Sequence, residues 1–218
     1  MQFKVIGLAI SFSPTTAAML AEAGRLAIQF NARLILIHVG KHSPYEDQKA
    51  EELIASSGVL REIIKIVWKQ GDPVKEILAA CQEEKIELLV AGALKKENLV
   101  NHYLGTVARK IMHKARCSVL MITNPSLTYT PIKNIVVNGE DSPFIKEAIQ
   151  AGCEWGRPDH AWIHIVRELK LLGLALAANE QYNEEEYDQS KQQMVQQEVN
   201  EVEAMLKTIP HEKSRINI

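Results

Sequence analysis

The sequence predicts an α/β fold: a doubly wound, Rossmann-like parallel sheet of five strands, followed by a second, partial copy of the same fold. Two observations support this prediction. Short apolar runs alternate with helical patterns through the first half of the chain, and the opening strand and helix pattern reappears after a Pro- and Ser-containing stretch. With 46% hydrophobic and 24% charged residues, the 218-residue chain can bury a sizeable core.

Each element of the first copy is predicted by its own local signal. The run Arg33–Val39 is almost wholly apolar, which indicates a strand buried on both faces. Ser13 and Pro14 are expected to cap and begin the first helix, and Asp72 with Pro73 the third. The five predicted strands are Phe3–Ile10, Arg33–Val39, Glu62–Trp68, Glu87–Ala93 and Ser118–Thr123. Helices are expected from Pro14 to about Phe30, after Pro44 to about Ser57, from Asp72 to about Glu84, and over Gly105–Lys114.

Strands joined through helices pair in parallel by right-handed crossovers, and ligands of such sheets bind beyond the carboxyl ends of the strands. The segments that follow strands one, two and four are "AISFSP", "HVGKHSP" and "GALKKENLVNHYLGT". The sequence therefore predicts that a binding site lies at this edge of the sheet.

The second half of the chain repeats the first. Lys133, Ser142 and Pro143 fall on Lys4, Ser13 and Pro14 at one constant offset, and "AWIHIV" falls on "LILIHV". Two matched strand and helix pairs in order favour a duplicated domain over chance Ser-Pro matches, which remain the alternative. We expect a complete domain at 1–124, a linker at 125–131 and a partial domain at 132–218.

The partial copy is expected to hold two matched strands, a helix from about Asn183 to Lys207 and a third strand at Ser214–Ile218. Counterparts of strand four, the glycine loop, helix four and strand five are missing from it. The helix has a heptad-like apolar seam, which favours packing on its own sheet, with a partner helix as the alternative.

Composition excludes several classes of protein. A net charge of -2 gives no electrostatic reason to expect nucleic acid or an anionic membrane as a partner. The three widely spaced cysteines, Cys81, Cys117 and Cys153, suit a reducing compartment, and Cys117 is expected to be an inert core thiol. No apolar run is long enough for a membrane span. We expect a cytoplasmic protein.

The chain resembles the universal stress protein family, in its tandem form. The resemblance rests on "SFSPTTAAMLAEAGRLAIQFNARLILIHV", "GDPVKEIL" and "VAGALKKENLVNHYLGTVARKIMHKARCSVLMI". That family carries a nucleotide signature of glycine, two residues, glycine, nine residues, glycine, then serine or threonine. The resemblance implies a site for ATP or another adenine nucleotide, no metal and no catalysis.

Site residues carried over from the family are partly replaced. Gly92, Gly105 and Thr106 match the first glycine, the third glycine and the hydroxyl position, but the second glycine is Lys95. The resemblance also implies contacts from Val39 and Val107.

The family tends to carry an acidic residue just after strand one. The matching position is Ser11 in the first copy and Glu140 in the second.

These departures weaken a phosphate cradle. Glycine allows positive φ and close backbone approach, whereas Lys95 loses this freedom and adds a long side chain. Ser11 loses the charged acceptor for a ribose or adenine donor. Lys95 and Lys96 could instead hold an anion by charge, although an exposed loop with incidental lysines is the favoured interpretation.

Other chemistry has little support. No GxSxG or Walker pattern is present, and His38 and His164, which end matched strands, are expected to be satisfied by local groups rather than to bind a ligand. The resemblance, with these departures, therefore implies a non-enzymatic regulatory or binding module of the stress response with a degenerate nucleotide site. An ATP-binding stress sensor is the alternative. The resemblance also implies a homodimer that pairs through strand five, Ser118–Thr123.

Overall fold

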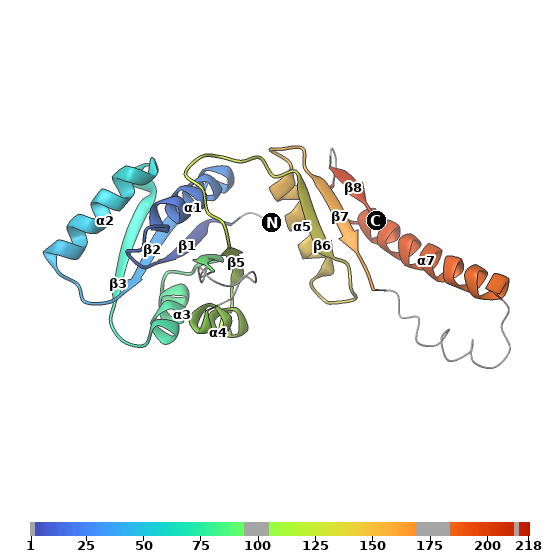
Figure 1. Ribbon diagram of the computed structural model, residues 1–218, viewed down its shortest axis with the longest axis horizontal. Helices are drawn as coiled ribbons and strands as arrows, with labels where there is room; N and C mark the ends of the chain where they lie inside the picture. The colour runs from blue at the N-terminus through green and yellow to red at the C-terminus, as the bar shows by residue number, and fades with distance from the viewer. Residues whose placement is uncertain (1–2, 94–104, 169–183, 212–213) are drawn as a thin grey trace. The chain divides into compact units, whose positions relative to one another are not determined.

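The computed structural model describes the whole chain except residues 1–2, 94–104, 169–183 and 212–213 (Figure 1). The chain divides into two compact units, one ending at Thr130 and the other running from Pro131 to Ile218. Each unit has its own sheet and its own hydrophobic core, and each is described by itself.

The first unit is built on a five-stranded sheet in the order β3-β2-β1-β4-β5, and every pair in it is parallel. The strands are β1 (Val5–Ile10), β2 (Arg33–Val39), β3 (Ile64–Lys69), β4 (Leu88–Gly92) and β5 (Ser118–Ile122). The strand order reverses between β1 and β4, so the predicted doubly wound fold is confirmed. The carboxyl ends of β1, β2 and β4 consequently meet at one edge.

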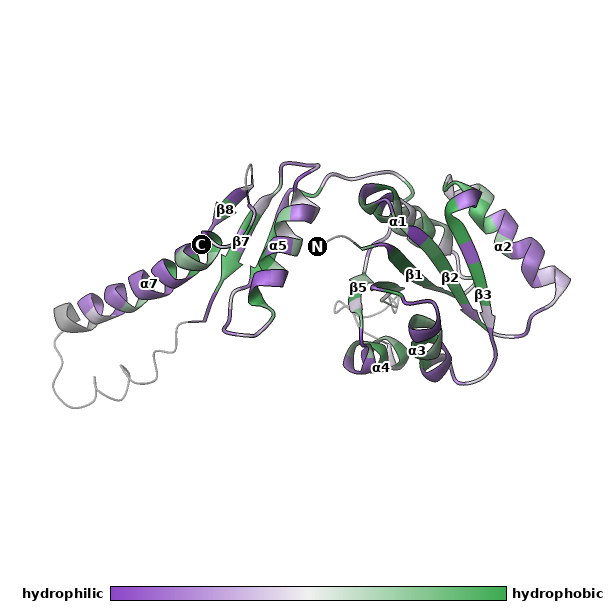
Figure 2. Ribbon diagram, turned by 180° about the vertical axis from the view of Figure 1, so that it is seen from behind, coloured by the Kyte–Doolittle hydropathy of each residue, from purple (hydrophilic) through white to green (hydrophobic). Residues whose placement is uncertain are grey.

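In the part of this unit that the structure describes, four helices cover the sheet: α1 (Thr16–Phe30), α2 (Pro44–Ser57), α3 (Pro73–Glu83) and α4 (Thr106–Lys114). Figure 1 shows α1 and α2 on one side of the sheet and α3 and α4 on the other. The central strands are sandwiched between these layers, and Leu34, Ile35, Leu36 and Ile37 are all 0–1% exposed. The nearly continuous apolar colour of β1 and β2 in Figure 2 reflects this two-sided burial.

The structure corrects three predicted boundaries. The first strand begins at Val5 rather than at Phe3. The first helix begins at Thr16 rather than at Pro14, because a hydrogen-bonded turn precedes it: the Thr16 N–H donates to the Ser13 carbonyl oxygen, and the Ser13 N–H donates to the Thr16 hydroxyl. Residues Arg61–Ile63 form a 3-10 turn, η1, so β3 begins at Ile64 rather than at Glu62. The predicted start of α3 is correct, since the Asp72 carboxylate accepts a hydrogen bond of 2.9 Å from the Lys75 N–H.

The second unit holds a parallel sheet in the order β6-β7-β8, with β6 (Asn134–Asn138), β7 (Trp162–Val166) and β8 (Arg215–Asn217). Among the described residues of this unit, the helices are α5 (Ile145–Gly156) and α7 (Glu184–Leu206). Both helices pack on the sheet face that carries Val137, Ile163 and Ile165. A second, partial copy of the fold is thus present, as predicted.

The seam of α7 is used within the second unit. Val202 and Leu206 are buried in the core of that unit together with Ile209, whereas Val195 is 39% exposed. The end of the helix near Leu206 therefore packs on its own sheet, which is the favoured interpretation of the heptad-like pattern.

Within the described parts of the chain, no helix has the length and apolar character needed to cross a membrane.

Candidate functional site

A cavity of about 570 Å³ lies at the carboxyl edge of the first sheet. It is bounded by the ends of β1, β2 and β4, by the starts of α1 and α3, and by the first turns of α4. Its volume is in the range of sites for small molecules. The described residues that line it are Ala9, Ile10, Ser11, Ser13, Thr15, Thr16, Met19, Ile37, Val39, Pro73, Ile77, Ala91, Gly92, Ala93, Gly105, Thr106, Val107, Ala108 and Ile111.

The structure brings six of the seven candidate residues of the first copy to this one cavity. They are Ser11, Val39, Gly92, Gly105, Thr106 and Val107. The seventh, Lys95, lies outside the described residues, as does Lys96. Glu140 belongs to the second unit.

Hydroxyl groups gather where the chain leaves β1. The Thr16 hydroxyl donates a hydrogen bond to the Ser11 carbonyl oxygen and accepts one of 3.1 Å from the Ser13 N–H. Thr16 is only 3% exposed, the sole buried polar residue among those described. It fixes the backbone that carries Ser11 to the rim of the cavity. The sequence pattern gives no sign of this role for Thr16, because the role depends on the chain turning back toward Ser11.

The opposite rim is formed by the end of β4 and the start of α4. Gly105 is the N-cap of α4 with φ −59 and ψ 156, so its backbone is extended and needs no positive φ. A Cβ placed on Gly92 would come no closer than 3.5 Å to the sulfur of Met19, an ordinary contact. Neither glycine is therefore required by strain in this structure, and what each provides is an open approach to the backbone.

The start of α4 is suited to an anion. Its first turn contains no acidic residue, and no side chain caps it at Gly105. The first N–H groups of a helix have no partner within the helix and carry the positive end of its dipole. Thr106 adds a hydroxyl at the same place.

No ionisable side chain is present among the described lining residues. The polar side chains are all hydroxyls, on Ser11, Ser13, Thr15, Thr16 and Thr106, and the remaining lining is apolar or backbone. The cavity can therefore offer hydrogen bonds and apolar contact, but in its described part it offers no side-chain charge.

An aromatic cluster adjoins the β1 rim of this cavity. The Phe12 ring lies 4.7 Å from that of His38, and the Trp68 ring lies 5.2 Å from His38 and 4.6 Å from His42. Burial lowers the pKa of His38, opposed by its hydrogen bond with the Ile10 carbonyl oxygen and by the charge of Glu46. The local satisfaction expected of His38 agrees with that 3.3 Å contact. The sequence pattern does not predict this aromatic cluster, because its members come from three separate segments of the chain.

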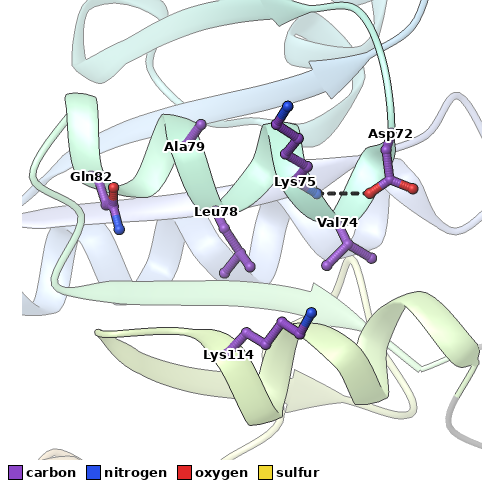
Figure 3. Close-up of a pocket in the computed structure, with 7 residues that line it drawn as sticks. All are labelled: Asp72, Val74, Lys75, Leu78, Ala79, Gln82 and Lys114. Atoms are coloured by element: carbon purple, nitrogen blue, oxygen red, sulfur yellow. Dashed lines mark hydrogen bonds between the residues drawn. The ribbon is translucent and has the colours of Figure 1, made fainter.

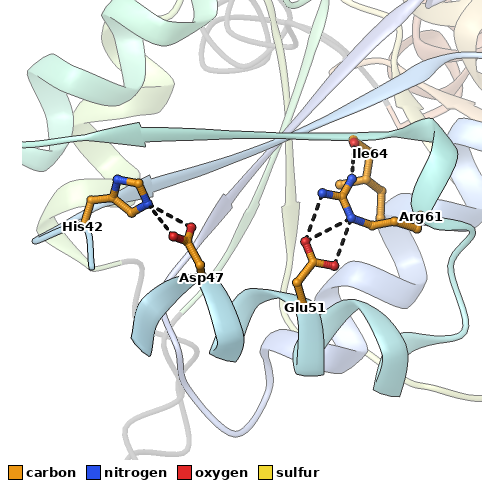
Figure 4. Close-up of polar contacts among 5 residues, drawn as sticks. All are labelled: His42, Asp47, Glu51, Arg61 and Ile64. Atoms are coloured by element: carbon orange, nitrogen blue, oxygen red, sulfur yellow. Dashed lines mark hydrogen bonds and ion pairs between the residues drawn. The ribbon is translucent and has the colours of Figure 1, made fainter. Parts of the chain in front are cut away.

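Two polar contacts at the surface join α2 to neighbouring segments (Figure 4). His42 Nε2 lies 2.8 Å from an Asp47 carboxylate oxygen, and the Arg61 guanidinium contacts both carboxylate oxygens of Glu51. Arg61 also donates to the Ile64 carbonyl oxygen at 2.8 Å. The start of β3 is thereby tied to α2.

A second hollow, of about 380 Å³, lies on the outer face between α3 and α4 (Figure 3). Lys75 and Lys114 reach its rim, and Leu78 and Val74 form its apolar floor. It is shallow, and none of the candidate residues line it. In the described chain, no group of three or more His, Cys, Asp or Glu side chains is placed to hold a metal ion.

Glu140 of the second unit is held by its own surroundings. Its carboxylate accepts a 2.6 Å hydrogen bond from the Glu168 N–H, beyond the end of β7. The neighbouring Arg167 pairs with Asp141, Glu198 and Glu201 at 2.9–3.2 Å. His164 contacts Asn134 and Asn217 through its two ring nitrogens, the local satisfaction expected of it.

Comparison with known proteins decides the family. A universal stress protein of Thermus aquaticus is 30% identical over 137 residues, which cover 55% of this chain and 98% of that relative. The chain belongs to the universal stress protein family. The family model, described as "Universal stress protein family", matches residues 46–123.

Other comparisons agree. A universal stress protein of Methanocaldococcus jannaschii is 27% identical over 142 residues, or 56% of this chain and 84% of the relative. A solved structure of a putative universal stress protein from Pseudomonas aeruginosa has a TM-score of 0.62 and 16% identity, with 98% of this chain and 73% of that chain covered. At that identity the match shows a shared fold.

Proposed function

We propose that the first unit is a regulatory binding module of the stress response whose cavity has lost high affinity for ATP. The observation that supports this proposal is the chemistry of the cavity lining, which carries five hydroxyl side chains and no ionisable one among the described residues. Ser11 stands where the family tends to carry an acid. The module acts by binding and not by catalysis.

The charge of the ligand is the deciding quantity. A triphosphate requires several N–H donors or cations to replace the water it loses, whereas one helix start supplies about half a unit of positive charge. The start of α4, with the Thr106 hydroxyl beside it, is therefore suited to a ligand that carries little negative charge. The cavity therefore suits a small neutral or weakly charged molecule, such as a nucleoside, better than it suits ATP.

Isothermal titration calorimetry with adenosine, AMP and magnesium-ATP tests the proposal. We expect no micromolar binding of ATP and no phosphate release from it. Lys95→Gly combined with Ser11→Asp restores the two family positions, and a gain of ATP binding in that variant is the expected result. Micromolar binding of ATP by the unchanged protein would contradict the proposal.

An ATP-binding stress sensor is the second candidate function. It is favoured by the convergence of Gly92, Gly105 and Thr106 at one cavity beside a helix start. The variant Gly105→Glu places a carboxylate at that helix start. The sensor is established, in place of the degenerate module, if the unchanged protein binds ATP and this variant does not, while the variant still binds adenosine.

We also propose that the protein forms a homodimer through β5. This strand is at the edge of its sheet, and Val119, Leu120, Met121 and Ile122 on it are all half-buried rather than buried. Pairing would bury these side chains and the free strand edge. Sedimentation at micromolar concentration should give a dimer that Leu120→Glu dissociates, and a monomeric unchanged protein would refute this proposal.

A further inference from the structure

Two cysteines that the binding proposal does not use lie in one layer of the first core. Cys81, near the end of α3, is 7% exposed, and Cys117, directly before β5, is half-buried. Cys117 packs against the cluster of buried residues under α3 and α4 that contains Cys81. Both thiols are free.

The backbone brings the two cysteines to the same place. The Cys81 carbonyl oxygen accepts a 2.9 Å hydrogen bond from the Ile86 N–H, and the Ser118 N–H donates one of 3.1 Å to the carbonyl oxygen of Glu87. Ile86 and Glu87 are adjacent, directly before β4. Ile86 bonds to Cys81, and Glu87 bonds to the residue that follows Cys117, so the two cysteine segments lie next to each other. The two cysteines are far apart in the sequence and come together only because of the order of the strands in the sheet.

The two thiols have different acidities. The Cys81 thiol donates a hydrogen bond to the sulfur of Cys117, which lowers the pKa of Cys117 to about 7 in spite of its partial burial. Backbone N–H groups of Cys117 and Leu89 contribute in the same direction. The same hydrogen bond, together with burial, raises the pKa of Cys81. Near neutral pH the pair thus combines a half-buried thiol of lowered pKa with a protonated thiol beside it, as in reactive dithiols.

We propose that Cys117 and Cys81 form a peroxide-reactive dithiol that closes to a reversible intramolecular disulfide. The Cys117 thiolate attacks one oxygen of hydrogen peroxide, the O–O bond breaks, and the hydroxide that leaves takes a proton from solvent to become water. Cys117 is then a sulfenic acid. The Cys81 sulfur, losing its proton, attacks the Cys117 sulfur and expels hydroxide, which leaves with that proton as water.

Electrons balance in this sequence. Two thiols lose two electrons in total to form one disulfide, and one hydrogen peroxide is reduced to two molecules of water. A thiol reductant reverses the reaction. The bond joins α3 to the turn between α4 and β5, and the same core layer includes Ile77 and Ile111, which line the cavity. Oxidation would therefore fix the two helices that form one wall of the cavity.

Cys153 provides a matched control. It is 1% exposed in the core of the second unit, among Val137, Ile149 and Ile163. It has the same chemistry as the other two cysteines, but the core cluster around it contains no second cysteine among the described residues.

The experiment treats the fully reduced protein with hydrogen peroxide, blocks the remaining thiols with iodoacetamide, and maps unreduced peptides by mass spectrometry. We expect one linked peptide joining Cys81 to Cys117, absent after dithiothreitol, in both the unchanged protein and Cys153→Ser. Cys81→Ser should accumulate a sulfenic acid at Cys117 that dimedone traps, and Cys117→Ser should leave Cys81 reduced.

The rate of oxidation should rise with pH until Cys117 is fully ionised. A protein in which Cys117 stays reduced, or in which it is overoxidised without any link to Cys81, would overturn the proposal. Disulfides found only between chains would do the same. The mapping of the unchanged protein gives this answer even if a serine variant fails to fold.

Discussion

Replacing Thr16 by valine tests how the rim of the cavity is held. Valine keeps the branched shape of the side chain but removes the hydroxyl that bonds the Ser11 carbonyl oxygen and the Ser13 N–H. Each lost hydrogen bond is worth about 1 kcal/mol net, and its partners are only partly buried, so water can replace part of what is lost. We expect the free energy of unfolding of the first unit to fall by about 1–2 kcal/mol.

The assay is urea denaturation followed by tryptophan fluorescence. Trp68 is the tryptophan of the first unit, so a background in which Trp155 and Trp162 are phenylalanine makes the signal specific to that unit. Thr15→Val is the matched control, since exposed Thr15 contacts only the Ser13 hydroxyl through its side chain, at 3.3 Å, among the hydrogen bonds of the described residues. If the two variants differ by less than about 0.5 kcal/mol, Thr16 does not hold this turn and the reasoning is wrong.

Three further predictions concern single sites. Asp72→Ala should cost the first unit about 1 kcal/mol, because the Lys75 N–H loses its cap, and the same denaturation assay measures it. NMR titration should place the pKa of His38 below its usual value, and a raised value would contradict the burial seen here. Since the folded state resists protonation of His38, its contribution to stability is complete above the usual histidine pKa and declines as the pH falls from there toward the lowered value. Ile149→Ala should destabilise the second unit by about 3 kcal/mol, as Ile149 is 0% exposed, and its thermal transition should move while that of the first unit does not.

Periodicity predicted most of the first unit because its central strands, β1, β2 and β4, are apolar on both faces. The run Arg33–Val39 could only be a central strand, and the structure gives those bounds for β2. Local hydrogen bonding explains the errors. The Thr16 hydroxyl competes with the helix for the Ser11–Ser13 backbone, and a 3-10 turn at Arg61–Ile63 uses residues whose composition suits a strand.

The candidate site was predictable where one segment carries the signal. Gly92, Gly105 and Thr106 stand at family spacing, and they do line one cavity. The supporting residues were not predictable in this way. Phe12 meets Trp68, and Cys81 meets Cys117, only because the sheet order brings distant segments together. Sequence separation gives no measure of such contacts.

The lining of the cavity also changes the interpretation of the glycine loop. Gly105 has an extended backbone and Gly92 has room for a methyl group, so the conformational argument for glycine is weaker than the sequence indicated. The argument from charge is stronger, because the described lining has only hydroxyls to offer.

Titration of the ¹⁵N-labelled protein with magnesium-ATP and, separately, with adenosine tests the central claim most directly. The amides of Gly92, Gly105 and Thr106 report from the rim of the cavity. The account predicts saturable shifts of these amides with adenosine and none with ATP at micromolar concentration. Saturable shifts of the same three amides with micromolar ATP would contradict it.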